Sequence, residues 1–334
     1  MPKLLSIIIS NRNDTAMLSV TVNSCIEELR PLGLKNCEII ICDNSDESIY
    51  KTLRSYIPIG YLRTHLIKIS RQSFPCLFTA REQAIKDSSG TYICCLDSHM
   101  IVGRDMFVHL VNFMEKNKDD KTLAFAHAPI NWAHHHSDYS RHDRDMSKNE
   151  LGDWGTVHSS CRPITWKGMP WICRRSLWSD IRGYGALAEH KVSWGGGDMH
   201  IGIKPWLLGL KNWAVPANAA IHIGPFPSKV KSKDYQYRLY SASGNFPHTF
   251  GFLVSCYVLG GESMMKRNEP ILTKRFGQYI DTKKWWDKAK EIGKEEKAWL
   301  DENKTMTFEQ LLETRPWDDY EVPSKVKTLR ANTG

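Results

Sequence analysis

The sequence lacks the features that mark membrane-spanning and disulfide-stabilised proteins. No apolar run approaches the roughly 18 to 20 residues that a membrane-spanning helix needs, and the segment Met1–Leu5 does not resemble a signal peptide. The nine cysteines include no Cys-x-x-Cys pair, and their odd number leaves at least one thiol unpaired. We therefore expect an intracellular, cytoplasmic protein with buried free thiols.

A glycine-rich phosphate-binding turn is also missing. The apolar run Leu4–Ser10 predicts a buried strand, and the residues after it, Asn11–Asp14, favour turns and helix caps but include no glycine. Dinucleotide-binding Rossmann proteins have glycines at this turn so that the backbone can approach a pyrophosphate. That class is therefore excluded, and a bound diphosphate needs another partner, such as a metal ion.

Charge of one sign is only moderately in excess. The 334 residues include 45 basic and 37 acidic side chains, which gives a formal net charge of +8. Such a balance permits an anionic partner, whether a nucleotide diphosphate, a nucleic acid or an anionic membrane surface, without requiring one.

The sequence alternates between strand and helix patterns. Strands are predicted at residues 4–10, 38–42, 66–70, 90–97, 123–127 and 168–173, and helices at 15–31, 77–85 and 106–114. The short connections in the first hundred residues predict a doubly wound α/β sheet. After about residue 241 the patterns become helical or irregular, and Thr307–Gln310 fits a capping box for a last helix.

Two of the predicted strands end on acidic residues, Asp43 and Asp97. Side chains alternate across a strand, so Asp97 and His99 are expected on one side and Ser98 on the other. Ligands of open α/β sheets bind outside the carboxyl ends of the strands. Asp97 and His99 are therefore candidates for a two-ligand metal site, and a simple polar turn is the alternative.

Three successive glycines, Gly195–Gly197, stand between Trp194 and Asp198. Such a run is entropically costly and indicates close approach of the backbone to a ligand. Asp198 starts a predicted helix, where it is either a simple N-cap or a general base. His222 lies in an apolar extended segment, where a lone histidine is more often a core residue than a ligand.

Taken together, residues 4–226 resemble the glycosyltransferases of the GT-A fold, in particular family 2, the polypeptide N-acetylgalactosaminyltransferases and the β-galactosyltransferases. Asp97-Ser98-His99 resembles their D-x-D-type metal motif in its Asp-Ser-His form. The other matching segments are Arg81–Ile85, similar to Ala-Arg-Asn-x-Gly; Asp43-Asn44-Ser45, similar to Asp-Asp-x-Ser; Trp194–Asp198, similar to Trp-Gly-Gly-Glu-Asp; and His222, at the place of a third metal ligand.

The resemblance implies a fold and a division of the chain. The expected fold is an α/β, Rossmann-like GT-A mixed sheet flanked by helices, with a mainly helical C-terminal extension. The catalytic domain is expected to span residues 1–226, with a nucleotide-sugar half at 1–100 and an acceptor half at 101–226 that includes a long loop at 128–170. The extension is then 227–334.

The resemblance also implies the roles of site residues. Asp97, His99 and His222 are expected to hold Mn²⁺, with Mg²⁺ as the alternative, and Asp198 is expected to be the base of an inverting transfer. Gly197 departs from the family, which has an acid at that position. The residues expected to bind the UDP-sugar are Asn11, Arg12, Asp43, Asn44, Arg71, Arg81, Asp97, Ser98, Trp194, Gly195 and Gly196.

The acceptor and the oligomeric state stay open at this point. The aromatic and histidine-rich loop 128–170 and the Lys/Tyr segment 229–240 allow a DNA acceptor, such as a hydroxymethylated base that leaves the stack. Disorder and a solvated loop are the respective alternatives. A glycan, protein or small-molecule acceptor is equally compatible, and a non-catalytic basic nucleic-acid-binding module on a GT-A scaffold is a different class of function.

Overall fold

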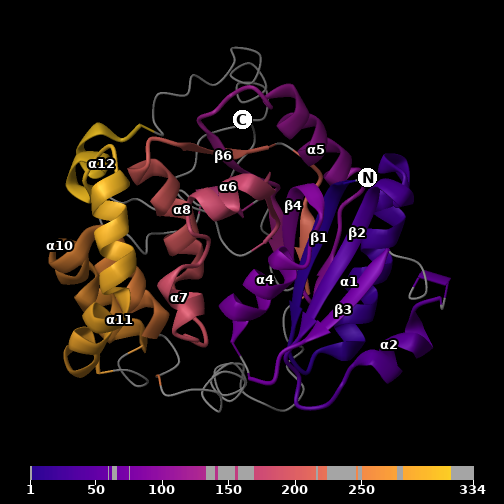
Figure 1. Ribbon diagram of the computed structural model, residues 1–334, viewed down its shortest axis with the longest axis horizontal. Helices are drawn as coiled ribbons and strands as arrows, with labels where there is room; N and C mark the ends of the chain where they lie inside the picture. The colour runs from indigo at the N-terminus through magenta and orange to yellow at the C-terminus, as the bar shows by residue number, and fades with distance from the viewer. Residues whose placement is uncertain are drawn as a thin grey trace, which may run out of the picture.

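The computed structural model describes residues 2–58, 60–61, 66–74, 76–132, 140–141, 155–156, 169–215, 217–223, 246, 250–276 and 281–316. Within these ranges the chain forms a seven-stranded sheet with helices around it (Figure 1). The strands of this sheet are β1 (Lys3–Asn11), β2 (Cys37–Asp43), β3 (Ile67–Arg71), β4 (Gly90–Asp97), β6 (Leu123–His127), β10 (Trp171–Arg174) and β11 (Lys211–Ala214).

The sheet is mixed. Its strand order is β11-β6-β10-β4-β1-β2-β3. The neighbours β4, β1, β2 and β3 run parallel, whereas β10 is antiparallel to both β4 and β6. The register places Asp97 of β4 beside Ser10 of β1, and Asn11 beside Asp43 of β2. The two acidic strand ends therefore lie at one edge of the sheet, on either side of the end of β1.

Smaller strands and ten α-helices complete the described part. The helices are α1 (Thr15–Leu29), α2 (Tyr50–Tyr56), α4 (Leu77–Lys86), α5 (Met106–Lys116), α6 (Arg175–Asp180), α7 (Ala186–Glu189), α8 (Gly197–Leu207), α10 (Phe250–Phe276), α11 (Thr282–Asn303) and α12 (Phe308–Thr314). A three-stranded sheet contains β5 (Met100–Ile101), β12 (Ala220–His222) and β7 (Ile130–Trp132), and a ribbon pairs β8 (Ser140–Arg141) with β9 (Gly155–Thr156). The expected GT-A architecture with a helical C-terminal region is confirmed.

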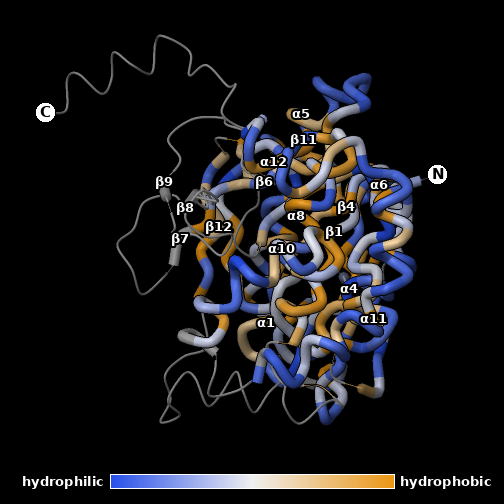
Figure 2. Tube along the Cα trace, turned by 90° about the vertical axis from the view of Figure 1, so that its left-hand side faces the viewer, coloured by the Kyte–Doolittle hydropathy of each residue, from blue (hydrophilic) through white to orange (hydrophobic). Residues whose placement is uncertain are grey.

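The core lies on both faces of the sheet. Ile7–Ile9 of β1 and Ile39–Ile41 of β2 are fully buried, and the hydrophobic parts of the trace are concentrated inside the molecule around β1 and β4 (Figure 2). Parallel strands covered on both faces have continuous apolar sequences, which is the pattern observed here. This packing fixes the strand ends, and so the polar residues that follow them.

The described cysteines agree with the expectation of buried free thiols. Eight cysteines, all buried, carry free thiols in the described ranges. Within those ranges, none of the helices combines the length and the apolar character needed to span a membrane.

The C-terminal helices are joined to the rest of the fold by a buried ionic cluster. Glu296 of α11 accepts hydrogen bonds from Nζ of Lys204 at 2.5 Å and from the backbone N–H of Ala186 at 2.7 Å, and it contacts Nε2 of His200 at 2.9 Å. Burial would raise the pKa of Glu296, but His200 and the Lys204 ammonium outweigh it and hold that pKa well below its usual range. The cluster ties α11 to α8.

Replacing Glu296 with alanine is expected to lower the free energy of unfolding by about 3–5 kcal/mol, because the buried Lys204 ammonium loses its carboxylate. Chemical denaturation measures this loss. The matched control is Glu291→Ala on the same helix, which removes an exposed carboxylate paired with Lys288 and should change stability by less than about 1 kcal/mol. Equal losses in the two variants would contradict a structural role for the cluster.

Candidate active site

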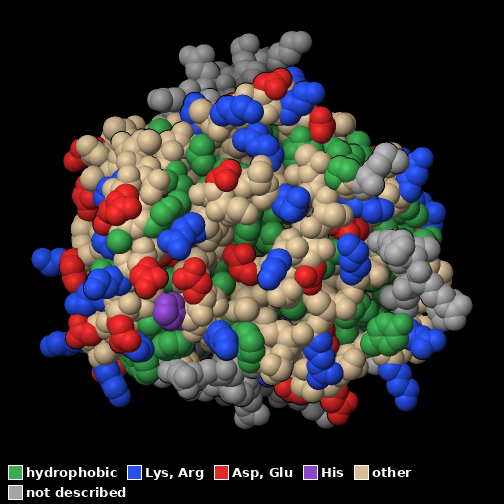
Figure 3. All heavy atoms as spheres, viewed as in Figure 1, with side chains coloured by type: hydrophobic (Ala, Val, Ile, Leu, Met, Phe, Trp, Pro, Cys, Tyr) green, Lys and Arg blue, Asp and Glu red, His purple; other side chains and the backbone are tan. Residues whose placement is uncertain are grey.

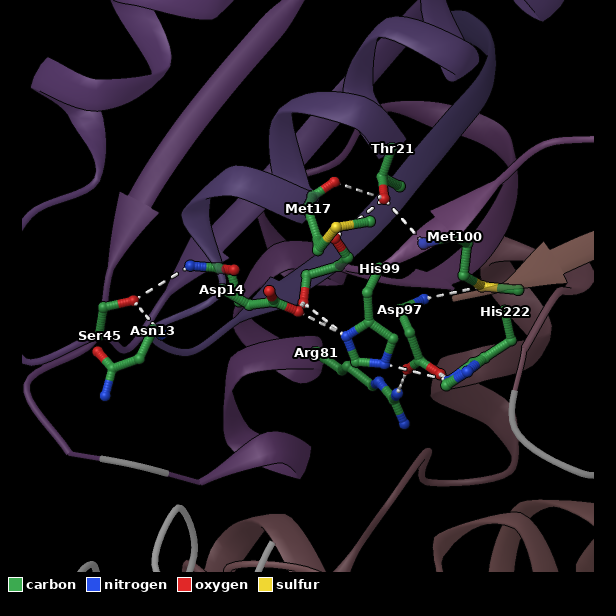
Figure 4. Close-up of polar contacts among 12 residues, drawn as sticks. Asn13, Asp14, Met17, Thr21, Ser45, Arg81, Asp97, His99, Met100 and His222 are labelled. Carbon is green, nitrogen blue, oxygen red and sulfur yellow. Dashed lines mark hydrogen bonds and ion pairs between the residues drawn. The ribbon is translucent and has the colours of Figure 1, made fainter. Parts of the chain in front are cut away.

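Asp97, His99 and His222 converge at the carboxyl end of β4 (Figure 4). Asp97 is the last residue of β4, His99 lies in the turn that follows, and His222 is the last residue of β12. Antiparallel pairing of His222 with Met100 of β5 brings this distant histidine beside His99. The two Nε2 atoms are 3.1 Å apart, and His222 Nε2 lies 3.6 Å from Asp97 Oδ2.

This donor set fits a divalent cation. One ligand atom from each of the three side chains lies within 4.8 Å of the others. Two imidazole nitrogens and a carboxylate oxygen suit Mn²⁺, whereas Mg²⁺ and Ca²⁺ typically bind in all-oxygen sites. Three protein ligands leave coordination positions open for other oxygens, such as those of a diphosphate. The chemistry of the residues therefore agrees with a metal site.

The protonation of the cluster follows from its neighbours. Burial would raise the pKa of Asp97, but the nearby His222 imidazole and the charge of Arg81 hold it well below its usual range. Asp97 is therefore a carboxylate, as a metal ligand must be. Burial would lower the pKa of His99, but the hydrogen bond with Asp14 and the charge of Asp97 raise it.

Ser98 lies between the two ligands and faces helix α1. The strand ends at Asp97, and Ser98 and His99 form a turn that brings His99 beside Asp97, as predicted. The Ser98 side chain is buried, with Oγ 3.5 Å from Asp14 Oδ2, and its carbonyl accepts a hydrogen bond from Thr21 at 2.9 Å. A role for Ser98 in donor binding stays a prediction.

Arg81 connects the cluster to the centre of the fold. This buried residue of α4 donates from Nη2 to Asp97 Oδ1 at 2.8 Å and from Nη1 to the Tyr184 hydroxyl at 3.0 Å. The charge of Asp198 also acts on Arg81 and on Tyr184. Arg81 holds Asp97 in place and keeps it charged.

The predicted nucleotide-binding residues gather at the ends of β1, β2 and β3. Asn11, Asp43 and Arg71 lie side by side in register. Asn11 Nδ2 donates to Asp43 Oδ1 at 3.1 Å, and Ser45 Oγ donates to the same oxygen at 2.6 Å. Arg12 donates to the carbonyl of Asn44 at 2.7 Å. The loop after β2 is thus bonded to the end of β1, the strand that lies between β2 and β4.

The glycine run forms a tight entry to helix α8. Gly195 and Gly196 have positive φ angles of 97° and 73°, and Gly196 is the N-cap of the helix. The interpretation of Asp198 as a simple N-cap is therefore wrong, because Asp198 lies inside the first turn. A Cβ at Gly196 would lie 2.6 Å from the carbonyl oxygen of Gly251 in α10, and one at Gly197 would overlap the ring of Phe78.

Two contributors to the site were not predicted from the sequence. Asp14 contacts His99, with Oδ2 2.7 Å from Nδ1, and Tyr184 anchors Arg81. The sequence signal for Asp14 is an acid in the turn after the first strand, which was interpreted only as a turn and cap residue. Most of loop 128–170 and all of segment 229–240 lie outside the described residues.

The comparisons with known proteins concern the family and the fold. Residues 6–163 match the model of glycosyl transferase family 2. No curated protein matches the sequence. Among solved structures, GalNAc-T7 with UDP, GalNAc and Mn²⁺ has a TM-score of 0.63 at 18% identity over 88% of this chain and 55% of that one. TarS of S. aureus has a TM-score of 0.52 at 12% identity over 79% of this chain and 43% of that one.

The chain thus spans about half the length of the structures that it matches, and at these identities the likeness concerns the fold. The residues matched by the family model include β1, the loop after β2 and the Asp97-Ser98-His99 motif. We conclude that residues 6–163 resemble glycosyl transferase family 2 and that the chain has the α/β fold of these glycosyltransferase structures.

Proposed function

We propose that the protein transfers a sugar from a UDP-sugar to an acceptor hydroxyl with the help of Mn²⁺. The convergence of Asp97, His99 and His222 carries this proposal. The similar GalNAc-T7 structure, which holds UDP, GalNAc and Mn²⁺, supports it. Mg²⁺ is the alternative cation. When bound, the cation supplies charge neutralisation for a departing diphosphate.

Separate groups of residues are proposed to bind the nucleoside, the cation and the sugar. In this proposal the loop containing Asp43 and Asn44, together with Asn11, Arg12 and Arg71, holds the nucleoside, and Asp97, His99 and His222 bind the cation. Arg81 keeps Asp97 charged and oriented, through its 2.8 Å ion pair. Trp194, Gly195 and Gly196 line the sugar side of the site.

Asp198 is the proposed general base of an inverting reaction. The acceptor oxygen forms a bond to the anomeric carbon while the bond from that carbon to the diphosphate oxygen breaks, and the acceptor proton passes to the Asp198 carboxylate. A base of this kind contributes about a hundred- to ten thousandfold to the rate. The position of Asp198 in the first turn of α8 supports the assignment, because the helix dipole favours the carboxylate form that a base needs.

The acceptor class is proposed from the sequence. A hydroxymethylated base in DNA stays a prediction from the sequence, because segment 229–240 lies outside the described residues. On the described part of the face in Figure 3, basic and acidic side chains are interspersed rather than gathered in one basic stripe. That arrangement does not favour DNA over a glycan or a protein acceptor, and the location of the protein in the cell is likewise a prediction.

Incubation with Mn²⁺ and a panel of UDP-sugars is expected to release UDP slowly, because a transferase without its acceptor passes the sugar to water. Chelation by EDTA should stop the release. Addition of DNA with hydroxymethylated bases, of glycans or of protein should accelerate it only for the true acceptor class. Tight DNA retention that weakens with salt, without any UDP release, would instead indicate the non-catalytic binding module.

A further inference from the structure

Asp14 occupies the N-cap position of helix α1 but does not cap it. An aspartate there normally accepts a hydrogen bond from the N–H of the second or third helical residue. The Asp14 side chain makes no such bond. Its Oδ2 lies instead 2.7 Å from Nδ1 of His99, and the carboxylate points toward that ring (Figure 4). The Asp14 side chain therefore contacts the candidate metal ligand His99 and does not cap helix α1.

This contact determines how His99 presents its second nitrogen. A carboxylate at this distance accepts the Nδ1–H hydrogen and favours the tautomer with the lone pair on Nε2. Nε2 is the atom that faces Nε2 of His222 at 3.1 Å. The other tautomer would direct a hydrogen atom into the space between the three ligands. The carboxylate also fixes the rotation of the ring.

Helix α1 fixes the backbone around His99 as well. Thr21 Oγ1 donates to the carbonyl of Ser98 at 2.9 Å and accepts from the N–H of Met100 at 2.9 Å. Ser24 Oγ accepts from the N–H of Val102 at 3.2 Å. The turn is therefore bonded to one helix on both sides of His99, and the same helix carries Asp14 at its start. The His99 ring and the backbone on both sides of it are therefore both held by helix α1.

We infer that Asp14 is a positioning residue for the metal site, acting through His99 and not as a ligand itself. The inference deepens the proposed function and rests on it. Carboxylates that orient ligating histidines raise metal affinity by about 10–100-fold. A carboxylate this close could also attract a cation by its charge alone. The two effects can be separated by removing His99. Orientation of the ring by Asp14 then no longer contributes to metal affinity, whereas attraction by the charge of Asp14 remains.

The test measures Mn²⁺ affinity directly, from the electron paramagnetic resonance signal of free Mn²⁺. Asp14→Asn is expected to weaken binding by about 10–100-fold. The matched control is Asp105→Asn, which removes an equal charge from a half-exposed side chain whose ion partner is Arg104, and binding should be unchanged. On a His99→Ala background, Asp14→Asn should cause no further loss. Thermal unfolding checks that each variant is folded.

Affinity of folded Asp14→Asn within about twofold of the parent would overturn the inference, and so would a further loss on the His99→Ala background. A second measurement needs no variant: ¹⁵N NMR of labelled histidine in the parent protein with the diamagnetic ion Zn²⁺. We expect His99 to carry its proton on Nδ1, and a proton on Nε2 would overturn the inference. A parent protein that binds no Mn²⁺ would refute the metal site itself.

Discussion

Asp97→Asn is expected to lose Mn²⁺-dependent binding of the UDP-sugar and to lower transfer by about a thousandfold or more, since a metal ion supplies several kcal/mol of charge stabilisation. Asp97 is the one carboxylate among the three candidate ligands. Asparagine keeps the shape and leaves an oxygen for Arg81, so the variant removes charge with little change in packing. Titration with Mn²⁺ and with UDP-sugar measures the two losses separately.

The parent protein supplies the control for this result. Its UDP-sugar affinity should fall when EDTA is added, and the affinity of Asp97→Asn should already be at that low level and insensitive to the chelator. UDP-sugar binding that is unaffected by EDTA in the parent would contradict a metal site at Asp97. Circular dichroism of both proteins excludes unfolding as the cause.

Asp198→Asn is expected to lower kcat for transfer by about a hundred- to ten thousandfold, because the acceptor proton loses its base. Binding of the UDP-sugar and of Mn²⁺ should stay at the parent level, since Asp198 belongs to α8 and not to the three metal ligands. Steady-state kinetics with the acceptor, combined with equilibrium binding of the donor, separates the two quantities.

Asp180→Asn at the end of α6 is the matched control, because it removes an exposed carboxylate from the helix before α7 and should keep full activity. Proton NMR of the product gives an independent check. An inverted anomeric centre is expected, and retention of configuration would rule out Asp198 as the base of a single displacement. An Asp198→Asn enzyme with parent activity would do the same.

Much of the fold could be predicted because local patterns and burial coincide. The run Leu4–Ser10 became β1 and the run Gly90–Asp97 became β4 with the predicted end. The capping box at Thr307 starts α12 as predicted. Helix α2 was not predicted, because Tyr50–Tyr56 has no clear apolar periodicity. The antiparallel direction of β10 depends on its neighbours β4 and β6, which no local pattern encodes.

The site was predictable where a motif is continuous in sequence. Asp97 and His99 are two residues apart, so a single strand end identified both. His222 reaches them only through the pairing of β12 with β5, a contact between residues more than a hundred positions apart. The resemblance to a family, not the pattern, indicated this residue. Asp14 was missed because its sequence context predicts a helix cap, and only the tertiary structure shows a different partner.

The close approach of Gly197 to Phe78 ties two positions of the chain together. The ring occupies the space of a Cβ at position 197, so a side chain there requires the ring to move. That movement would disturb the packing of Phe78 on Tyr184, whose ring centroids are 4.9 Å apart. Tyr184 in turn holds Arg81. A side chain at position 197 would therefore act, through Phe78 and Tyr184, on the arginine that pairs with Asp97.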